Sequence, residues 1–283
     1  MRLVRLSLPL ILAGLCVLFC YQRGMYPGGS QASFAVPPQG QDGAGAPPPV
    51  REHPLMPALR FAKQAQEKME KNIQDYSATL LKRERYHGKL GDPQTILVKI
   101  RHQPFSVHVC LLDAKGNRGD EAIYVDGQND GKLLGHTTGL TGKLLGTVSL
   151  KPDGPIAMQG QRYPMTELGV LNLCRRLIEV GEEDLQHEEC EVKFQRGQQF
   201  QDRACTRIEV THPVRRDYFR FHVARIFVDE QRNVPLRYEA YDWPESPGGE
   251  PVLLEQYEYR DLKLNCGLTD ADFDPKNPEY QFR

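Results

Sequence analysis

Short runs in which apolar and polar residues alternate recur along most of this 283-residue chain. In one of them Ile96, Val98 and Ile100 alternate with Lys99 and Arg101. A two-residue period places successive side chains on opposite faces of a β-strand. Residues rich in Gly, Asn, Asp and Pro separate the runs, and such short connections favour antiparallel pairing. The sequence therefore predicts strands from Tyr76 onward and at 96–101, 105–111, 122–125, 132–134, 191–195, 204–210, 218–228, 236–242 and 252–264.

Two segments have a helical period instead. In residues 55–73 one stripe is formed by Leu55, Leu59, Ala62, Met69 and Ile73. A second stripe in residues 166–180 is formed by Leu168, Leu171, Cys174, Leu177 and Ile178. Such spacing is typical of helices that pack one face on a sheet. Thr166 is the expected N-cap of the second helix, and Gly181 is its expected C-terminal stop.

The order helix, strands, helix, strands predicts an α+β fold. We expect one large curved antiparallel sheet, an incomplete β-barrel with helices packed on one face, formed by a single domain at 55–283. A helix across the concave side of such a sheet would enclose an apolar cleft, which suits a hydrophobic ligand. The alternative is that side chains fill this space and make it an ordinary core.

The N-terminus has the character of an export segment. Arg2 and Arg5 precede an apolar run of 16 residues, 6–21, which is slightly shorter than the ~20 residues of a membrane-spanning helix. No small-residue cleavage site follows closely, and neither Cys16 nor Cys20 has the small residues that a lipoprotein signal requires. Residues 1–23 are therefore predicted to be an uncleaved membrane anchor, with a cleaved signal peptide as the alternative, and the rest is expected outside the cytoplasm.

Residues 24–54 are rich in Pro, Gly, Ser, Ala and Gln, and they include three consecutive prolines at 47–49. This composition offers too little apolar surface to fold, so a disordered linker is expected. The predicted location is periplasmic, tethered to the inner membrane by the N-terminal segment or secreted after cleavage.

No motif for a cofactor, metal or catalytic group is convincing. Gly139-Leu-Thr-Gly-Lys143 is too short for a phosphate-binding loop, and Asp126-Gly-Gln-Asn-Asp-Gly131 has too few carboxylates for a tight calcium site. The eight histidines form no metal-ligand spacing, and no Gly-x-Ser-x-Gly elbow is present. A net charge of -1 gives no basic excess for nucleic acid. We therefore expect a non-enzymatic protein without cofactor or metal.

Two of the seven cysteines lie in the N-terminal segment. Among the other five, Cys190 and Cys205 are the candidate disulfide, because they are expected on neighbouring strands. An odd number of cysteines leaves at least one thiol free or paired with a partner.

Aromatic residues gather in the last third of the chain. At alternate strand positions they usually form core, but they also suit the wall of an acyl-chain cavity. The candidate cavity residues, which include two aliphatic strand positions, are Val98, Ile100, Phe219, Phe221, Val223, Phe227, Tyr257 and Tyr259.

Several stretches resemble DUF1571, an uncharacterised family of exported bacterial domains. They are the segments 121–125, 129–133, 148–155, 163–169, 257–265 and 268–274. A wider resemblance, to the LolA and LolB carriers of lipoprotein sorting, rests on 225–229, 234–239 and 257–265. That resemblance implies a curved sheet closed by helices that holds acyl chains. No ligand residue of the carriers has a matching position here.

These observations predict a carrier or binding domain for a lipid, a lipoprotein acyl chain or another hydrophobic ligand. The first alternative is an envelope module that binds a protein or glycan partner through its sheet surface. The second is a hydrolase with dispersed carboxylates, which would place two carboxyl groups across a cleft.

Overall fold

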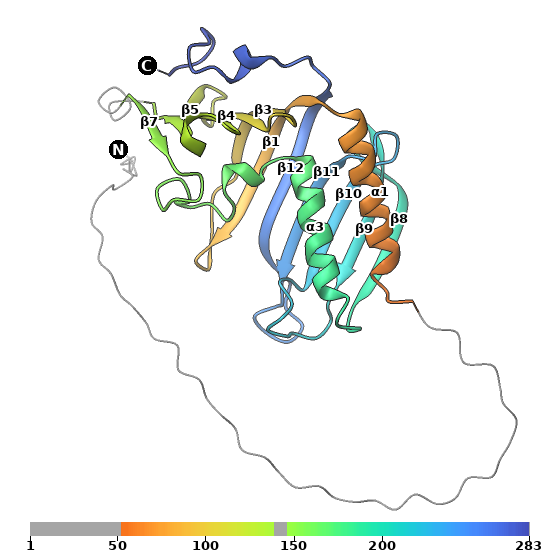
Figure 1. The fold of residues 1–283 in the computed structure, drawn as a ribbon. Coiled ribbons are helices and arrows are strands. Elements are labelled where there is room, and N and C mark those ends of the chain that lie inside the picture. Colours follow the sequence, from red (N-terminus) through yellow and green to blue (C-terminus); the bar gives the residue numbers. More distant parts are fainter. Residues whose placement is uncertain (1–51, 139–145, 283) are drawn as a thin grey trace, which may run out of the picture. The chain divides into compact units, whose positions relative to one another are not determined.

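A computed structural model describes residues 52–138 and 146–282 of the chain (Figure 1). The predicted anchor at 1–23, nearly all of the predicted linker and the 139–143 loop lie outside these residues. Contacts group Val50–Arg283 into one unit, which contains everything described here. Neither of the two described α-helices has the length and apolar character of a membrane span.

The described residues form a 12-stranded sheet in which every pair of neighbours is antiparallel. The strands are β1 (Asp75–Tyr86), β2 (Lys89–Leu90), β3 (Gln94–Arg101), β4 (Ser106–Leu112), β5 (Arg118–Val125), β6 (Leu133–His136), β7 (Thr147–Leu150), β8 (Glu191–Phe200), β9 (Arg203–Thr211), β10 (Val223–Asp229), β11 (Pro235–Asp242) and β12 (Val252–Leu264). Their order is β7-β6-β5-β4-β3-β1-β12-β11-β10-β9-β8, with β2 paired to β1. The sheet is not closed, because β7 and β8 are its two edges.

Helices α1 (Met56–Asn72) and α3 (Val170–Asp184) lie side by side across one face of the sheet, which we call the inner face (Figure 1). Short 3-10 turns occur at Asn129–Gly131, Met165–Glu167 and Asp270–Phe273. The α+β class, the curved antiparallel sheet and the helices on one face are confirmed.

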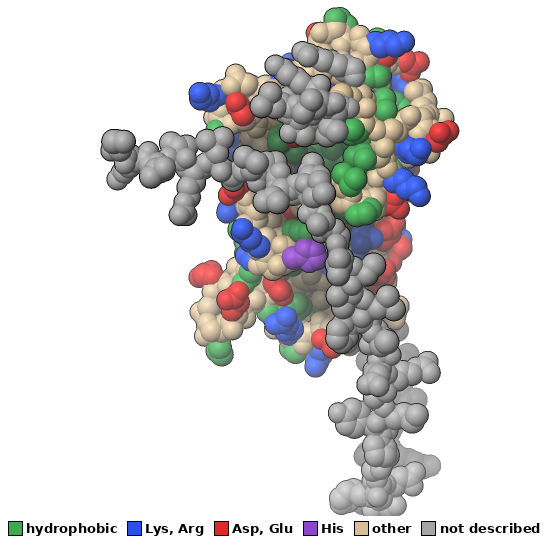
Figure 2. All heavy atoms as spheres, turned by 90° about the vertical axis from the view of Figure 1, so that its left-hand side faces the viewer, with side chains coloured by type: hydrophobic (Ala, Val, Ile, Leu, Met, Phe, Trp, Pro, Cys, Tyr) green, Lys and Arg blue, Asp and Glu red, His purple; other side chains and the backbone are tan. Residues whose placement is uncertain are grey.

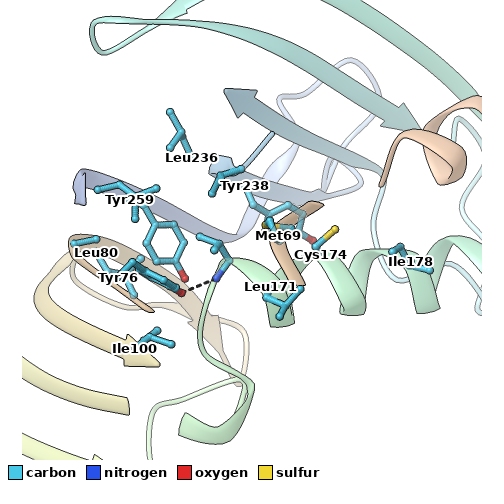
Figure 3. Close-up of a cluster of buried hydrophobic side chains, with 14 of the residues drawn as sticks. Met69, Tyr76, Leu80, Ile100, Leu171, Cys174, Ile178, Leu236, Tyr238 and Tyr259 are labelled. Carbon is cyan, nitrogen blue, oxygen red and sulfur yellow. Dashed lines mark hydrogen bonds between the residues drawn. The ribbon is translucent and has the colours of Figure 1, made fainter. Parts of the chain in front are cut away.

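The main core lies between the two helices and the central strands (Figure 3). Met69, Tyr76, Leu80 and Ile100 are completely buried there. The hydroxyl of Tyr76 accepts a hydrogen bond of 2.9 Å from the backbone N–H of Val170, the first residue of α3. This bond satisfies one of the N–H groups that a helix leaves without an intrahelical partner at its N-terminus.

The start and end of the second helix were predicted wrongly. It begins at Val170 after Gly169, and Thr166 belongs to the preceding 3-10 turn. Gly181 lies inside the helix, which continues to Asp184. The position requires a glycine, because a Cβ there would be 2.8 Å from Leu59 Cδ2 of α1. This glycine allows the two helices to approach closely, and it does not end α3.

Two strand predictions also need correction. The run predicted at 218–228 forms a strand only from Val223 onward, since residues 218–222 connect β9 to β10. Two strands were not predicted: the short β2 and β7, which forms one edge of the sheet. The remaining predicted strands are present with small shifts of their ends.

The last residues of the chain cover part of the opposite face. Phe273 and Tyr280 form a second apolar cluster with Ile123 and Val125 of β5. The ring of Tyr280 stacks on His108 with the ring centroids 4.0 Å apart. The C-terminal segment therefore shields the outer face of β4 and β5, while their inner face points toward the helix side.

Candidate ligand-binding cavity

A cavity of about 760 Å³ lies on the inner face of the sheet. Its walls come from β1, β3 to β7, β11 and β12, from helix α3 and from the segment 152–169 that leads into α3. The volume falls within the range of roughly 300–1,000 Å³ that small-molecule sites usually have. A much smaller space of about 90 Å³ lies beneath α1.

Most of the cavity wall is aliphatic. Strands β3 to β7 contribute inner-face side chains that alternate with residues on the other face, which is the pattern of strands buried on one side. Figure 2 shows hydrophobic side chains gathered in a recess on one face of the protein, with charged side chains around them. Much of the aliphatic wall consists of Ile96, Val109, Leu111, Ala122, Leu133, Val148, Leu150, Leu173 and Leu177.

One part of the wall is polar, because the pairing of β1, β12 and β11 brings polar side chains together there. Glu84 of β1 is directly opposite Glu255 of β12, and Lys82 is opposite Tyr257. Tyr257 is in turn opposite Tyr238 of β11. All five side chains line the cavity, so residues more than 150 positions apart in the sequence become neighbours. With two residues from the segment 152–169 they form what we call the inner polar cluster: Lys82, Glu84, Arg162, Tyr163, Tyr238, Glu255 and Tyr257.

Glu255 is only 4% exposed and has three partners in this cluster. The hydroxyls of Tyr163 and Tyr238 each donate to its Oε1 at 3.2 Å. Arg162 Nε lies 2.9 Å from its Oε2, although the N–H is not aligned for a hydrogen bond with any described residue. Burial raises the pKa of Glu255, and the charge of Arg162 opposes this increase. Burial also raises the pKa of Tyr163 to about 12, so its hydroxyl remains a donor.

Glu84, which is 7% exposed, is surrounded in the same way. It accepts a hydrogen bond from the hydroxyl of Tyr257 and pairs with Lys82 Nζ at 3.1 Å. The backbone N–H of Arg162 donates to its second oxygen at 3.2 Å. Lys82 also donates to the side chain of Gln161. The two carboxylates therefore hold the segment 152–169 against the sheet.

Three of the eight predicted cavity residues line this cavity: Phe221, Tyr257 and Tyr259. Val98 and Ile100 also lie on the inner face, but they are 2% and 0% exposed in the packed core. The structure therefore divides the inner face into a filled part and an open part, and alternation alone does not separate the two.

The other three predicted residues lie elsewhere. Phe219 stacks on His212 at 3.8 Å in the connection before β10. Val223 and Phe227 point away from the helices, because Ala224, which alternates with them, lies on the α1 side of β10. The prediction put 219–223 on one continuous strand, but the strand starts only at Val223.

Of the inner polar cluster, only Tyr257 was predicted from the sequence as a cavity residue. A signal was present in β1, where Lys82 and Glu84 continue the alternating positions of Tyr76 and Leu80, both of which are completely buried. Charged residues on a buried face require partners. Nothing local identifies those partners, because Arg162 and Tyr163 come from a segment without regular structure.

The predicted bridge between Cys190 and Cys205 is incompatible with this fold. Cys205 is opposite Gln198, and Cys190 lies before Glu191 at the far end of the same hairpin. At ~3.3 Å per residue this separates the two positions by roughly 25 Å, whereas a disulfide needs Cα atoms within about 7 Å. Both residues are buried free thiols. Among the described residues, no group of three or more His, Cys, Asp or Glu side chains could hold a metal ion.

Comparison with known proteins gives one family match. A model described as "Protein of unknown function (DUF1571)" matches residues 73–282, so the resemblance inferred from the sequence segments is confirmed. No curated protein matches the chain.

Solved structures with a similar arrangement include three bacterial proteins. Lipoprotein LppX of Mycobacterium tuberculosis is 14% identical, with 77% of this chain and 100% of that chain covered and a TM-score of 0.42. A DUF1329 family protein of Desulfovibrio piger is 12% identical, with coverages of 79% and 98% and a TM-score of 0.38. A LolA superfamily protein of Nitrosomonas europaea is 13% identical, with coverages of 75% and 97% and a TM-score of 0.31. All three scores are below 0.5, so no ligand or activity is transferred from these proteins.

Proposed function

The chain belongs to the DUF1571 family, and we propose its role from its own cavity. We propose that it is an extracytoplasmic, non-enzymatic domain that binds or carries a lipid, a lipoprotein acyl chain or a similar hydrophobic ligand. The observation that carries the proposal is the cavity of about 760 Å³. A core filled by side chains, which is the simpler expectation for a sheet of this kind, would leave no such space.

The lining supports a hydrophobic ligand. Aliphatic side chains of β3 to β7 and α3 form a large part of the apolar wall, and burying apolar ligand surface against them is favourable by roughly 25 cal/mol per Å². One group of polar residues forms the inner polar cluster, and further polar side chains, such as Asp120, His136 and Arg176, line other parts of the wall. A large apolar surface with a limited number of polar side chains is common in sites for small organic ligands.

The two alternatives are less well supported by the cavity. An interaction module that uses its sheet surface would have no need of an open interior. A hydrolase would need two carboxyl groups free to act across a cleft, whereas Glu84 and Glu255 are neighbours on a single wall. Both carboxylates are already engaged by tyrosine hydroxyls and cations, which favours a binding role over acid–base catalysis. Asp120 and Glu121 of β5 also line the cavity, and they already accept hydrogen bonds from Thr138 and Arg118.

The location is proposed from the N-terminal sequence. An anchor at 1–23, with Arg2 and Arg5 inside, would leave the cavity-containing unit outside the inner membrane. A flexible linker over 24–54 would have a root-mean-square end-to-end distance of roughly 30 Å. Such a tether allows the domain to reach the adjacent membrane surface or an envelope partner.

Mass spectrometry tests the proposed function. The full chain, purified without added lipid, is expected to carry an extra mass under native conditions that organic extraction removes. The variant Ala122→Trp, which places an indole into the cavity from β5, should lose this mass. The matched control is Ala204→Trp, at an exposed position of β9, which should retain it. A bare mass for the unmodified protein, together with no binding of a fluorescent acylglycerol, would instead favour the envelope interaction module.

A further inference from the structure

The inner polar cluster is electrically balanced. It contains two cations, Lys82 and Arg162, and two carboxylates, Glu84 and Glu255, which are paired at 3.1 Å and 2.9 Å. Both glutamates are more than nine-tenths buried. An ionised group brought into this place would have to displace one member of a buried ion pair, and leaving the other member unpaired is strongly unfavourable.

The same cluster keeps hydrogen-bonding capacity for an uncharged group. The ammonium of Lys82 has three N–H donors and two described partners, Glu84 and Gln161. The hydroxyls of Tyr163 and Tyr257 donate to the carboxylates, and their oxygens retain lone pairs that can accept. A hydroxyl, an ester or an amide can therefore add hydrogen bonds without breaking an ion pair.

The rest of the wall indicates where the apolar part of a ligand would lie relative to the inner polar cluster. The two glutamates are on the neighbouring strands β1 and β12. In the sheet order β3 follows β1 on its other side, and β4 to β7 follow outward from there. Aliphatic side chains of those outer strands, such as Val109, Leu133 and Leu150, line this part of the cavity. The two carboxylates of β5 that also line it, Asp120 and Glu121, already accept hydrogen bonds from Thr138 and Arg118. Strand spacing of ~4.8 Å makes this apolar part roughly 20 Å wide, which is long enough for an extended hydrocarbon chain.

We propose that the ligand of this cavity is an amphiphile with an uncharged hydrogen-bonding head group, such as a hydroxyl, ester or amide. The head group lies at the inner polar cluster, and the hydrocarbon chain lies along the aliphatic wall of β3 to β7. This assignment rests on the proposed function and restricts it, because it disfavours free fatty acid anions and alkyl ammonium ions as ligands.

Three amphiphiles with the same hydrocarbon chain test the head-group preference: monopalmitoylglycerol, palmitate and hexadecylamine. Each is titrated into the delipidated full chain by calorimetry at mildly alkaline pH, where the carboxylate is ionised and the amine is protonated. We expect monopalmitoylglycerol to bind at least about tenfold more tightly than either ion.

A variant tests whether the preference arises at the cluster. Glu255→Gln keeps the size of the side chain but leaves Arg162 without its counter-charge, so palmitate should bind about tenfold more tightly than it does to the unmodified protein. The affinity for monopalmitoylglycerol should change by less than about threefold. The control Glu239→Gln removes an equally buried carboxylate, paired with Arg237 at 2.7 Å on the other face of β11, and should leave all three affinities unchanged.

The results separate the two proposals. If palmitate or hexadecylamine binds as tightly as the glycerol ester, the head-group assignment is wrong, while a hydrophobic carrier remains supported. The assignment also fails if Glu255→Gln folds normally and leaves palmitate binding unchanged. If that variant does not fold, the head-group assignment is judged by the ranking of the three affinities for the unmodified protein. If none of the three binds, both the assignment and the proposed function are overturned.

Discussion

Tyr76→Phe removes a single hydroxyl from the centre of the protein and is expected to destabilise it measurably. Tyr76 and Val170 are both 0% exposed, and the hydroxyl is the 2.9 Å acceptor for the backbone N–H of Val170 (Figure 3). Val170 begins α3, so no earlier carbonyl of the helix can replace the lost acceptor. No water reaches this N–H, and the phenylalanine ring fills the remaining space.

The magnitude follows from leaving a buried donor without a partner, which costs about 1–3 kcal/mol. For a unit of this size a loss of about 2 kcal/mol corresponds to a fall of about 4–8 °C in the unfolding midpoint. The packing contribution should be nearly unchanged, because phenylalanine retains the ring. The effect is therefore assigned to the single hydrogen bond between β1 and the start of α3.

Urea and thermal unfolding followed by circular dichroism measure this change. Tyr86→Phe serves as the control, since Tyr86 is 38% exposed and its substitution should alter stability by less than about 0.5 kcal/mol. The urea midpoint of Tyr76→Phe should fall with the slope unchanged. A midpoint indistinguishable from that of the unmodified protein would refute the role assigned to this bond.

Three further outcomes are expected. Gly169→Ala should cost about 2–4 kcal/mol in unfolding free energy, because φ is 120° and the new Cβ would be 2.8 Å from the hydroxyl of Tyr76; unchanged stability in denaturant would contradict this. Cys190 and Cys205 should both react with a thiol reagent in the unfolded protein without prior reduction, and a mass lower by two hydrogens would reveal a bridge instead. Burial lowers the pKa of His108 from 6.5 to about 4. As the pH falls from 6.5 to 4, His108 therefore becomes protonated in the unfolded state but stays neutral in the folded state. Stability should therefore drop by up to about 3 kcal/mol relative to His108→Phe between pH 6.5 and 4, and parallel stability profiles for the two proteins would argue against it.

Much of the fold could be read from the sequence because its signals are local. A strand that buries one face must alternate, and runs such as 98–101 and 206–211 do so clearly. The two helices have apolar stripes with a helical period, and turn residues separate most strands. These local regularities were sufficient for the element types, the antiparallel sheet and the α+β class. The family segments added the resemblance to DUF1571, which the family match confirms.

Element ends and special glycines depended on contacts that are remote in sequence. Thr166 and Gly181 are ordinary signals for the ends of a helix, yet α3 starts after Gly169 and continues through Gly181. The reasons are the hydrogen bond from Val170 to Tyr76 and the close approach of Leu59 of α1. Both partners lie about a hundred residues away along the chain, where no local pattern points to them.

The cavity and its polar cluster were decided entirely by the tertiary structure. The sequence determined that alternate strand positions would be apolar, but it did not distinguish Val98 in the filled core from Ile96 at the open wall. Glu84 and Glu255 are in separate strands, and only the register between β1 and β12, the first and last strands along the chain, makes them neighbours. Strand alternation is a property of each local segment, whereas register and enclosed volume depend on which distant segments pair. For this reason the sequence alone predicted a sheet suited to a hydrophobic ligand, and only the folded chain showed where that ligand would fit.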